Sequence, residues 1–190
     1  MLILVRHGRT AANAGGLLVG HLDVPLDERG LEQAALLSKA LSDVDRVISS
    51  PLQRCRQTAE ALGRLFDVDE RWIELDYGEF DGQPLASIGR AVWDEWRADP
   101  NYVPAGGESL AALAERVSAA CDELMSEALE RNIVVVSHVS PIKAAAAWAL
   151  AAGVEIAWRS HIDQASITRV QVTPTGPVLR TFNETAHLDQ

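Results

Sequence analysis

Short apolar runs and longer stretches of helical spacing alternate along the chain. The first run, Leu2-Ile3-Leu4-Val5, is continuous, partly β-branched and followed by a polar turn. Such a run predicts a buried strand. Residues 46–49 and 133–136 predict two more strands of this kind, and residues 165–173 and 177–183 predict a closing pair joined by a turn.

The predicted helices lie between these strands, because apolar residues there recur three and four positions apart. The amphipathic ones span residues 27–41 and 110–124, a third follows the strand at 46–49 through about residue 66, and an alanine-rich one spans about 141–151. Strands that alternate with helices favour a largely parallel sheet covered on both faces, with the last strand pair at an edge.

We therefore expect fold class α/β, with a mostly parallel central sheet and an antiparallel edge. The 190 residues, nearly half of them apolar, fit one domain that spans 1–190. Residues 72–107 form an irregular segment, rich in glycine, proline and tryptophan, that we expect to cover the site, with one helix at 85–97.

Composition excludes several classes of protein. The formal net charge of −10 argues against nucleic acid and anionic membrane surfaces as partners. No apolar run is long enough to cross a membrane, and we find no signal peptide. Cys55 and Cys121 are too few and too far apart for a disulfide framework, so we expect reduced thiols and a cytoplasmic protein.

Basic side chains follow three of the predicted strands. Arg6 and His7 end the first strand, and His138 ends the third. After the second, Ser50 is a good N-cap, Pro51 suits the first helical position and Gln53 completes a capping box, which puts Arg54 in the first helical turn. Ser140 and Pro141 repeat this pattern after His138.

Because parallel strands end at the same edge of a sheet, these basic residues converge beside helix N-termini that favour anions. A neutral imidazole is a competent nucleophile, and two guanidinium groups can hold a transferring phosphoryl group with help from a second histidine. The proton donor we expect is Glu74, with Asp76, Glu79 and Asp81 nearby; shielding beside phosphate would raise the pKa of such a carboxyl.

Ordered motifs over nearly the whole chain carry a resemblance to a known family. They are Arg6 to Asn13 (R-H-G-x-T-x-x-N), Gly20 to Leu26 with Gly30, Ser49-Ser50-Pro51 with Arg54, Gln57-Thr58-Ala59, Glu74 with 78–82, 106–109, His138, and 182–188. The chain resembles the histidine phosphatase superfamily, in its phosphoglycerate-mutase-like branch, and the segment 137–143 resembles a bacterial acid-phosphatase-type subset.

The resemblance implies a three-layer α/β/α sandwich and a phosphohistidine at His7. It assigns the phosphate pocket to Arg6, Arg54 and His138, with Asn13 as an auxiliary contact and Glu74 as the proton donor. It implies no metal and no organic cofactor. The partner it implies is a small phosphorylated metabolite, hydrolysed as a phosphomonoester; a homodimer is left open.

Two departures from the family pattern keep alternatives open. Val139 stands where the family usually has glycine; we expect ordinary φ there or a slightly rebuilt loop. The chain also lacks the arginine that mutases carry after the second histidine, which favours a phosphatase over a cofactor-dependent phosphoglycerate mutase. A non-catalytic phosphate-binding member of the same fold is the third interpretation.

Overall fold

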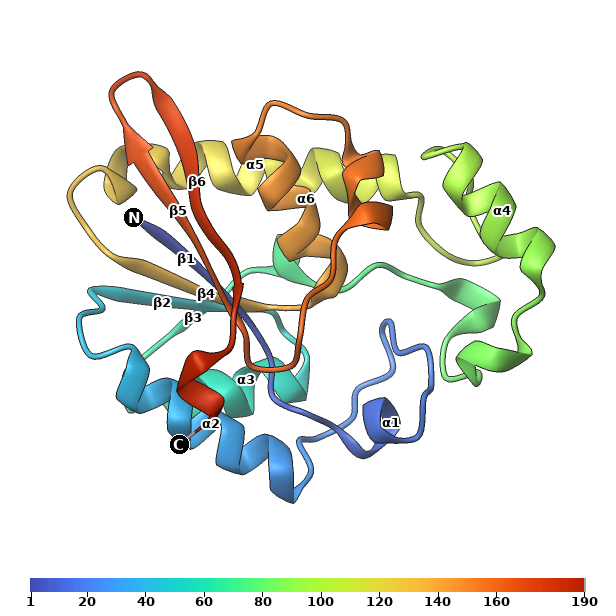
Figure 1. Cartoon of the computed structure of the whole chain (residues 1–190), viewed down its shortest axis with the longest axis horizontal. Coiled ribbons are helices and arrows are strands. Elements are labelled where there is room, and N and C mark those ends of the chain that lie inside the picture. The colour runs from blue at the N-terminus through green and yellow to red at the C-terminus, as the bar shows by residue number, and fades with distance from the viewer. Residues whose placement is uncertain (190) are drawn as a thin grey trace.

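The computed structural model describes residues 1–189, arranged around a six-stranded sheet (Figure 1). Its strands, in the order β3-β2-β4-β1-β5-β6, comprise a parallel group and an antiparallel hairpin at one edge. They are β1 (Leu2–Arg6), β2 (Arg46–Ser49), β3 (Asp67–Val68), β4 (Ile133–Ser137), β5 (Ile167–Thr173) and β6 (Gly176–Glu184).

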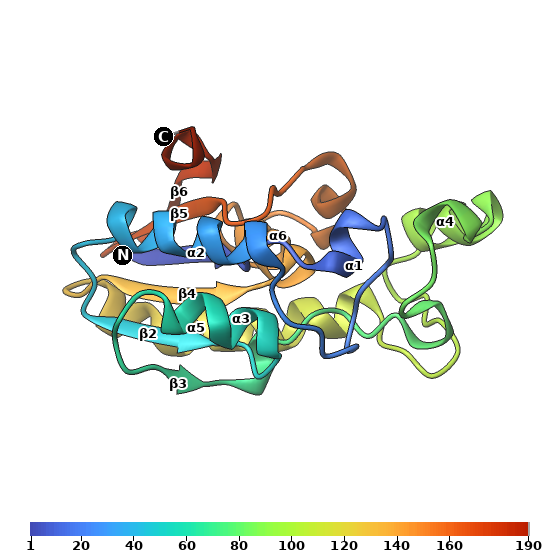
Figure 2. The same ribbon diagram turned by 90° about the horizontal axis from the view of Figure 1, so that it is seen from below.

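Helices cover both faces of this sheet. In Figure 2, α2 and α3 lie on the near face and α5 and α6 on the far one, while α4 projects at one end. The α-helices are α1 (Ala11–Ala14), α2 (Glu28–Ala40), α3 (Gln53–Glu60), α4 (Arg90–Ala98), α5 (Leu110–Ala128) and α6 (Val139–Ala149). Short 3₁₀ helices are η1 (Glu70–Trp72), η2 (Gly78–Phe80), η3 (Leu85–Ser87), η4 (Val154–Arg159) and η5 (Ala186–Leu188).

The central strands β1 and β4 are buried on both faces, which explains their continuous apolar sequence. Leu2 and Leu4 of β1 point into the core beneath α5 and α6, whereas Ile3 and Val5 point into the core beneath α2 and α3. The period of two along a strand thus supplies two cores from one run of residues. The predicted three-layer α/β/α sandwich is confirmed.

Element boundaries differ from the sequence prediction in several places. The helix after β2 ends at Glu60 rather than near residue 66, and the following two-residue strand β3 was not predicted. The helix expected at 85–97 is instead η3 followed by α4. Both residues of β3 are exposed, so no apolar pattern marks it.

Within residues 1–189, none of the helices combines the length and the apolar character that a membrane crossing requires.

Candidate active site

The predicted site residues meet at one edge of the sheet. Strands β1, β4 and β2 are parallel neighbours, with Arg6 opposite Ser137 and Ser49 opposite Val136. The residue after each strand therefore emerges at the same edge, and these residues are His7, His138 and Ser50. The segments that carry α1 and α4 lie beyond this edge (Figure 1).

The His7 imidazole is held in one orientation. Its Nδ1 lies 2.7 Å from the carbonyl oxygen of Gly8 and, facing an acceptor, must carry the ring proton. That tautomer leaves the lone pair of Nε2 for a substrate. The His7 backbone is fixed as well, since its N–H donates to Ser137 O at 3.0 Å and its carbonyl accepts from Ala165 N at 3.1 Å.

Close backbone packing explains the glycine that follows His7. A Cβ atom at Gly8 would lie 2.5 Å from the carbonyl oxygen of Gly30, near the start of α2. Gly30 in turn has no room for a Cβ against the backbone of Arg9. This pair lets the loop after β1 cross close to α2 and so sets where His7 lies.

His138 is fully buried against His7, with ring centroids 5.1 Å apart at an angle of 62°. Its Nδ1 accepts from Arg54 Nε at 3.3 Å, so its proton is on Nε2, which lies 2.7 Å from Ser50 Oγ. The Cys55 thiol is 3.3 Å from the same Nε2, and burial raises the pKa of this thiol. Cys55 and Cys121 are both free.

Burial lowers the pKa of both imidazoles well below the usual value. For His7 the positive charges of Arg54 and then Arg6 add to the loss of solvation, and for His138 the charge of Arg54 does the same. Both rings are therefore neutral at pH 7. For His7 this is the nucleophilic form.

The two arginines are buried and anchored by backbone carbonyl groups. Arg6 Nη1 donates to Ile162 O at 2.6 Å, and its Nε has no hydrogen-bond partner within the described chain. Arg54 Nη1 donates to Leu22 O at 2.9 Å and Nη2 to Gly20 O at 2.7 Å. Since each Nη atom carries two N–H groups, both guanidinium groups keep donors for an anion.

Glu74 is buried, and its carboxylate accepts backbone N–H groups at the start of α6. Oε1 accepts from Leu75 N at 2.8 Å and from Ser140 N at 3.1 Å, and Oε2 accepts from Val139 N at 3.1 Å. Glu74 thus caps this helix from a position far away in the sequence. The competing carboxylates are used elsewhere: Asp76 accepts from Gly78 N, and Asp81 accepts from the loop at 20–22.

Asn13 lies at the cavity but is partly committed to local structure. It completes a capping box with Thr10 at α1, in which its Oδ1 accepts from Thr10 N at 3.2 Å. Its amide N–H groups are the donors that this capping box does not use.

A cavity of about 260 Å³ lies over these residues. Of the predicted site residues, Arg6, His7, Asn13 and Glu74 line it. His138 is buried against His7, and Arg54 is buried against His138. Sequence reasoning missed Tyr77 and Gln164, which also line it. Gln164 belongs to no motif, so no signal pointed to it.

Two predicted helix caps are wrong. The helix after β2 begins at Gln53, whose N–H donates to Asp23 Oδ1 at 2.6 Å, while Ser50 is the partner of His138 instead. The helix after β4 begins at Val139, before Ser140 and Pro141. Arg54 still lies in the first turn of its helix, as predicted.

Val139 has ordinary backbone geometry. It is the first residue of α6, and its φ is not positive. The expectation of ordinary φ at this position is confirmed, and a β-branched residue there carries no backbone strain.

The remaining histidines and tryptophans lie outside this cluster. His161 is exposed beside Asp163, and His187 contacts Ala165 O. His21 Nε2 lies 3.0 Å from the carbonyl oxygen of Glu74, at the border of the site. Trp96 is fully buried in the core. Across residues 1–189, no group of three or more histidine, cysteine or acidic side chains has an arrangement that could hold a metal ion.

Comparison with known proteins agrees with this geometry. The model of the histidine phosphatase superfamily, branch 1, matches residues 2–185. The chain therefore belongs to the histidine phosphatase superfamily, whose members act on phosphomonoesters through a phosphohistidine.

Its relatives include several phosphatases. Phosphoserine phosphatase 1 of Hydrogenobacter thermophilus is 32% identical over 199 residues, which cover 100% of this chain and 94% of that protein. The structure of a phosphoserine phosphatase mutant from Entamoeba histolytica in complex with phosphoserine has a TM-score of 0.91 and 26% identity over 98% of both chains. A mycobacterial glucosyl-3-phosphoglycerate phosphatase in complex with VO3 has a TM-score of 0.87 and 30% identity over 97% of this chain and 98% of that one.

Proposed function

We propose that this chain is a metal-independent phosphatase that hydrolyses a small phosphomonoester through a phosphohistidine at His7. One observation carries this proposal: a neutral imidazole with its Nε2 lone pair open at a cavity, beside two buried arginines whose charges help to lower its pKa. A site that only bound phosphate would have no need of a nucleophile fixed in this tautomer.

The first step transfers the phosphoryl group. The lone pair of His7 Nε2 forms a bond to phosphorus while the bond to the ester oxygen breaks. The electron pair of that bond leaves with the oxygen, which takes a proton from the carboxyl group of Glu74. In the second step Glu74 takes a proton from water, whose oxygen attacks phosphorus, and the pair of the P–N bond returns to Nε2.

The arginines stabilise the charge that develops. Arg6 lines the cavity and presents its remaining Nη donors to the phosphoryl oxygens. Arg54 keeps two N–H groups for the same oxygens, and His138, packed against His7 with its Nδ1 on Arg54 Nε, lies beside the phosphoryl group once it is bound to Nε2. Asn13 adds its amide N–H groups at the cavity wall.

The substrate that this site takes is a small phosphorylated metabolite, and we place the reaction in the cytoplasm because both cysteines are free thiols. Phosphatase activity is favoured over mutase activity because the relatives reported above are named phosphatases. A homodimer stays a prediction.

The experiment that tests this function is hydrolysis of p-nitrophenyl phosphate in EDTA near neutral pH. We expect the wild type to turn over and to show a phosphohistidine by mass spectrometry after acid-free quenching. His7→Ala should abolish both signals, and the matched variant His161→Ala, at an exposed histidine, should keep both. Turnover that EDTA removes would contradict metal independence; equal turnover by His7→Ala would contradict the nucleophile.

A further inference from the structure

A second, smaller cavity adjoins the one that holds His7. It measures about 110 Å³ and shares three walls with the larger cavity, Leu18, Tyr77 and Val139. A group attached to a phosphate at His7 is therefore next to this space. None of the roles assigned above uses it.

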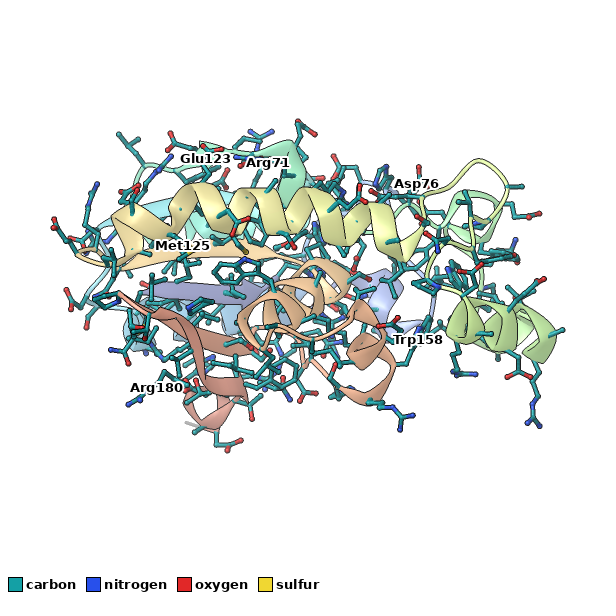
Figure 3. The ribbon with its side chains drawn as sticks, turned by 90° about the horizontal axis from the view of Figure 1, so that it is seen from above. Arg71, Asp76, Glu123, Met125, Trp158 and Arg180 are labelled. Carbon is teal, nitrogen blue, oxygen red and sulfur yellow. The ribbon has the colours of Figure 1, made fainter. Side chains whose placement is uncertain are left out.

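The walls of the smaller cavity are mainly apolar and aromatic. Trp93 of α4 and Trp158 of η4 contribute rings whose centroids are 6.3 Å apart at 81°, and Leu75 and Leu110 complete the surface. Figure 3 labels Trp158 where η4 faces α4. Both tryptophans are half-buried, and the Arg97 guanidinium lies over the Trp158 ring, 5.6 Å from its centroid, so the cavity is lined by the remaining parts of the two rings.

The polar side chains at this cavity are few. Tyr77 Oη and Ser140 Oγ are 3.2 Å apart and bond to each other. Lys143 Nζ donates to Ala157 O at 2.8 Å, which leaves two N–H donors of its ammonium group, while the stem of Lys143 adds methylene groups to the wall. Apart from these two donors a polar leaving group would find few open hydrogen-bond partners here, whereas an aromatic ring would meet aromatic faces and edges.

Val139 connects this feature to the departure from the family pattern. Val139 lines both cavities, at the position where the family usually has glycine. Unlike glycine, valine brings an isopropyl group to this shared wall. At about 110 Å³ the smaller cavity is below the roughly 150 Å³ of an engineered cavity that encloses one benzene molecule, so a group larger than a single ring does not fit, and a ring bound here extends toward the larger cavity.

We propose that the smaller cavity is a leaving-group subsite, and that the preferred substrates are phosphomonoesters whose alcohol carries a single aromatic ring. This inference rests on the phosphatase function proposed above. It assigns substrate discrimination to Trp93, Trp158 and Val139.

The test compares benzyl phosphate with ethyl phosphate, because both release primary alcohols of similar acidity and differ in the ring. We expect kcat/KM to be about 10- to 200-fold higher for benzyl phosphate, the range that a fitted apolar pocket supplies. Trp158→Leu and Trp93→Leu should each lower this ratio, because the ring then loses an aromatic wall. Trp148→Leu is the matched control, since Trp148 packs on α6 outside the cavity and donates to Asp122.

A substitution that fills the smaller cavity gives a second test, in case the tryptophan variants fail to fold. Ala157 lines the smaller cavity, and Ala157→Leu adds atoms there without removing any tryptophan. It should bring the benzyl-to-ethyl ratio close to one while circular dichroism and melting temperature stay near the wild-type values. A ratio near one in the wild type, or one that these variants leave unchanged, overturns the subsite alone. If neither ester nor p-nitrophenyl phosphate is hydrolysed, the proposed function itself fails.

Discussion

The junctions β2–α3 and β4–α6 have similar sequences but different structures. Each follows a buried strand and contains a Ser-Pro pair, Ser50-Pro51 in one and Ser140-Pro141 in the other. The first helix begins after its proline, whereas the second begins before its serine. In neither does the expected serine cap the helix.

Remote carboxylates cap both helices instead. Asp23 accepts from Gln53 N at the start of α3, and Glu74 accepts from Val139 N and Ser140 N at the start of α6. Of these two residues, Glu74 lines the cavity at His7 and Asp23 does not. The same stabilising contact thus serves structure at one junction, and structure together with proposed chemistry at the other.

Replacing each carboxylate by its amide should separate these roles, and this is the largest effect we expect. Glu74→Gln removes the proposed proton donor and should lower kcat/KM for an alkyl phosphate by about 10²- to 10⁴-fold. Asp23→Asn, outside the cavity, keeps an oxygen that can accept from Gln53 N and should change the unfolding free energy by less than about 0.5 kcal/mol, with kcat/KM near that of the wild type. Steady-state kinetics and urea denaturation measure both; equal kinetic losses would contradict the distinction.

Lowering the pH should weaken the β4–α6 junction and leave the β2–α3 junction unaffected. His138, before α6, and His7 beside it have pKa values well below that of an unfolded histidine, so below about pH 6.5 the unfolded chain binds protons that the folded chain does not. The unfolding free energy should therefore fall as pH falls, by up to about 1.4 kcal/mol per pH unit for each ring. The β2–α3 junction, residues 46–60, contains no histidine.

The measurement is urea denaturation between pH 7 and 5 on the wild type and on His138→Asn. Burial lowers the pKa of His187 as well, which contributes a slope of the same sign, so the informative quantity is the difference between the two proteins. Identical slopes would show that His138 does not titrate differently in the folded and unfolded states.

The two serines should differ next. Ser50→Ala leaves the fully buried His138 Nε2–H without its acceptor and should cost about 1–3 kcal/mol. Ser140→Ala removes a partner of the half-buried Tyr77 hydroxyl, for which water can substitute, and should cost less than about 1 kcal/mol. Chemical denaturation at pH 7.5 gives both values, and the reverse order would contradict the assignment of Ser50.

The smallest predicted effect concerns the other ends of these helices. Beyond α3 the chain turns at Gly63 with φ of +67°, but beyond α6 it turns at the exposed Ala151 with φ of 49°. Glycine adopts this conformation without the penalty that a Cβ atom imposes. Ala151→Gly should therefore raise stability, and Gly63→Ala should lower it, each by about 0.5–1 kcal/mol in thermal unfolding.

Local pattern predicted the strands, the helical faces and the meeting of Arg6, His7, Arg54 and His138, because buried strands and periodic helices leave a signal in consecutive residues. It failed where the determining contact is distant in sequence. Nothing near Gln53 shows that Asp23 caps it, and nothing near Val139 shows that Glu74 does.

Gln164 and the strand β3 illustrate two other limits. Gln164 reaches the cavity because the loop before β5 passes His7, which only the fold reveals. Both residues of β3 are exposed and bonded to β2, so pairing rather than composition defines the strand.

The position of β1 has a consequence for how the enzyme is made. Leu2 pairs with Ile133 on one side and with Val170 on the other, so the strand that ends at Arg6 cannot be built into the sheet until both partners have left the ribosome. His7 is therefore synthesised before the two strands that hold β1 in the sheet. A nascent chain in which β5 is incomplete lacks a flanking strand of β1, and phosphoryl transfer should begin only once residues 167–173 have been synthesised.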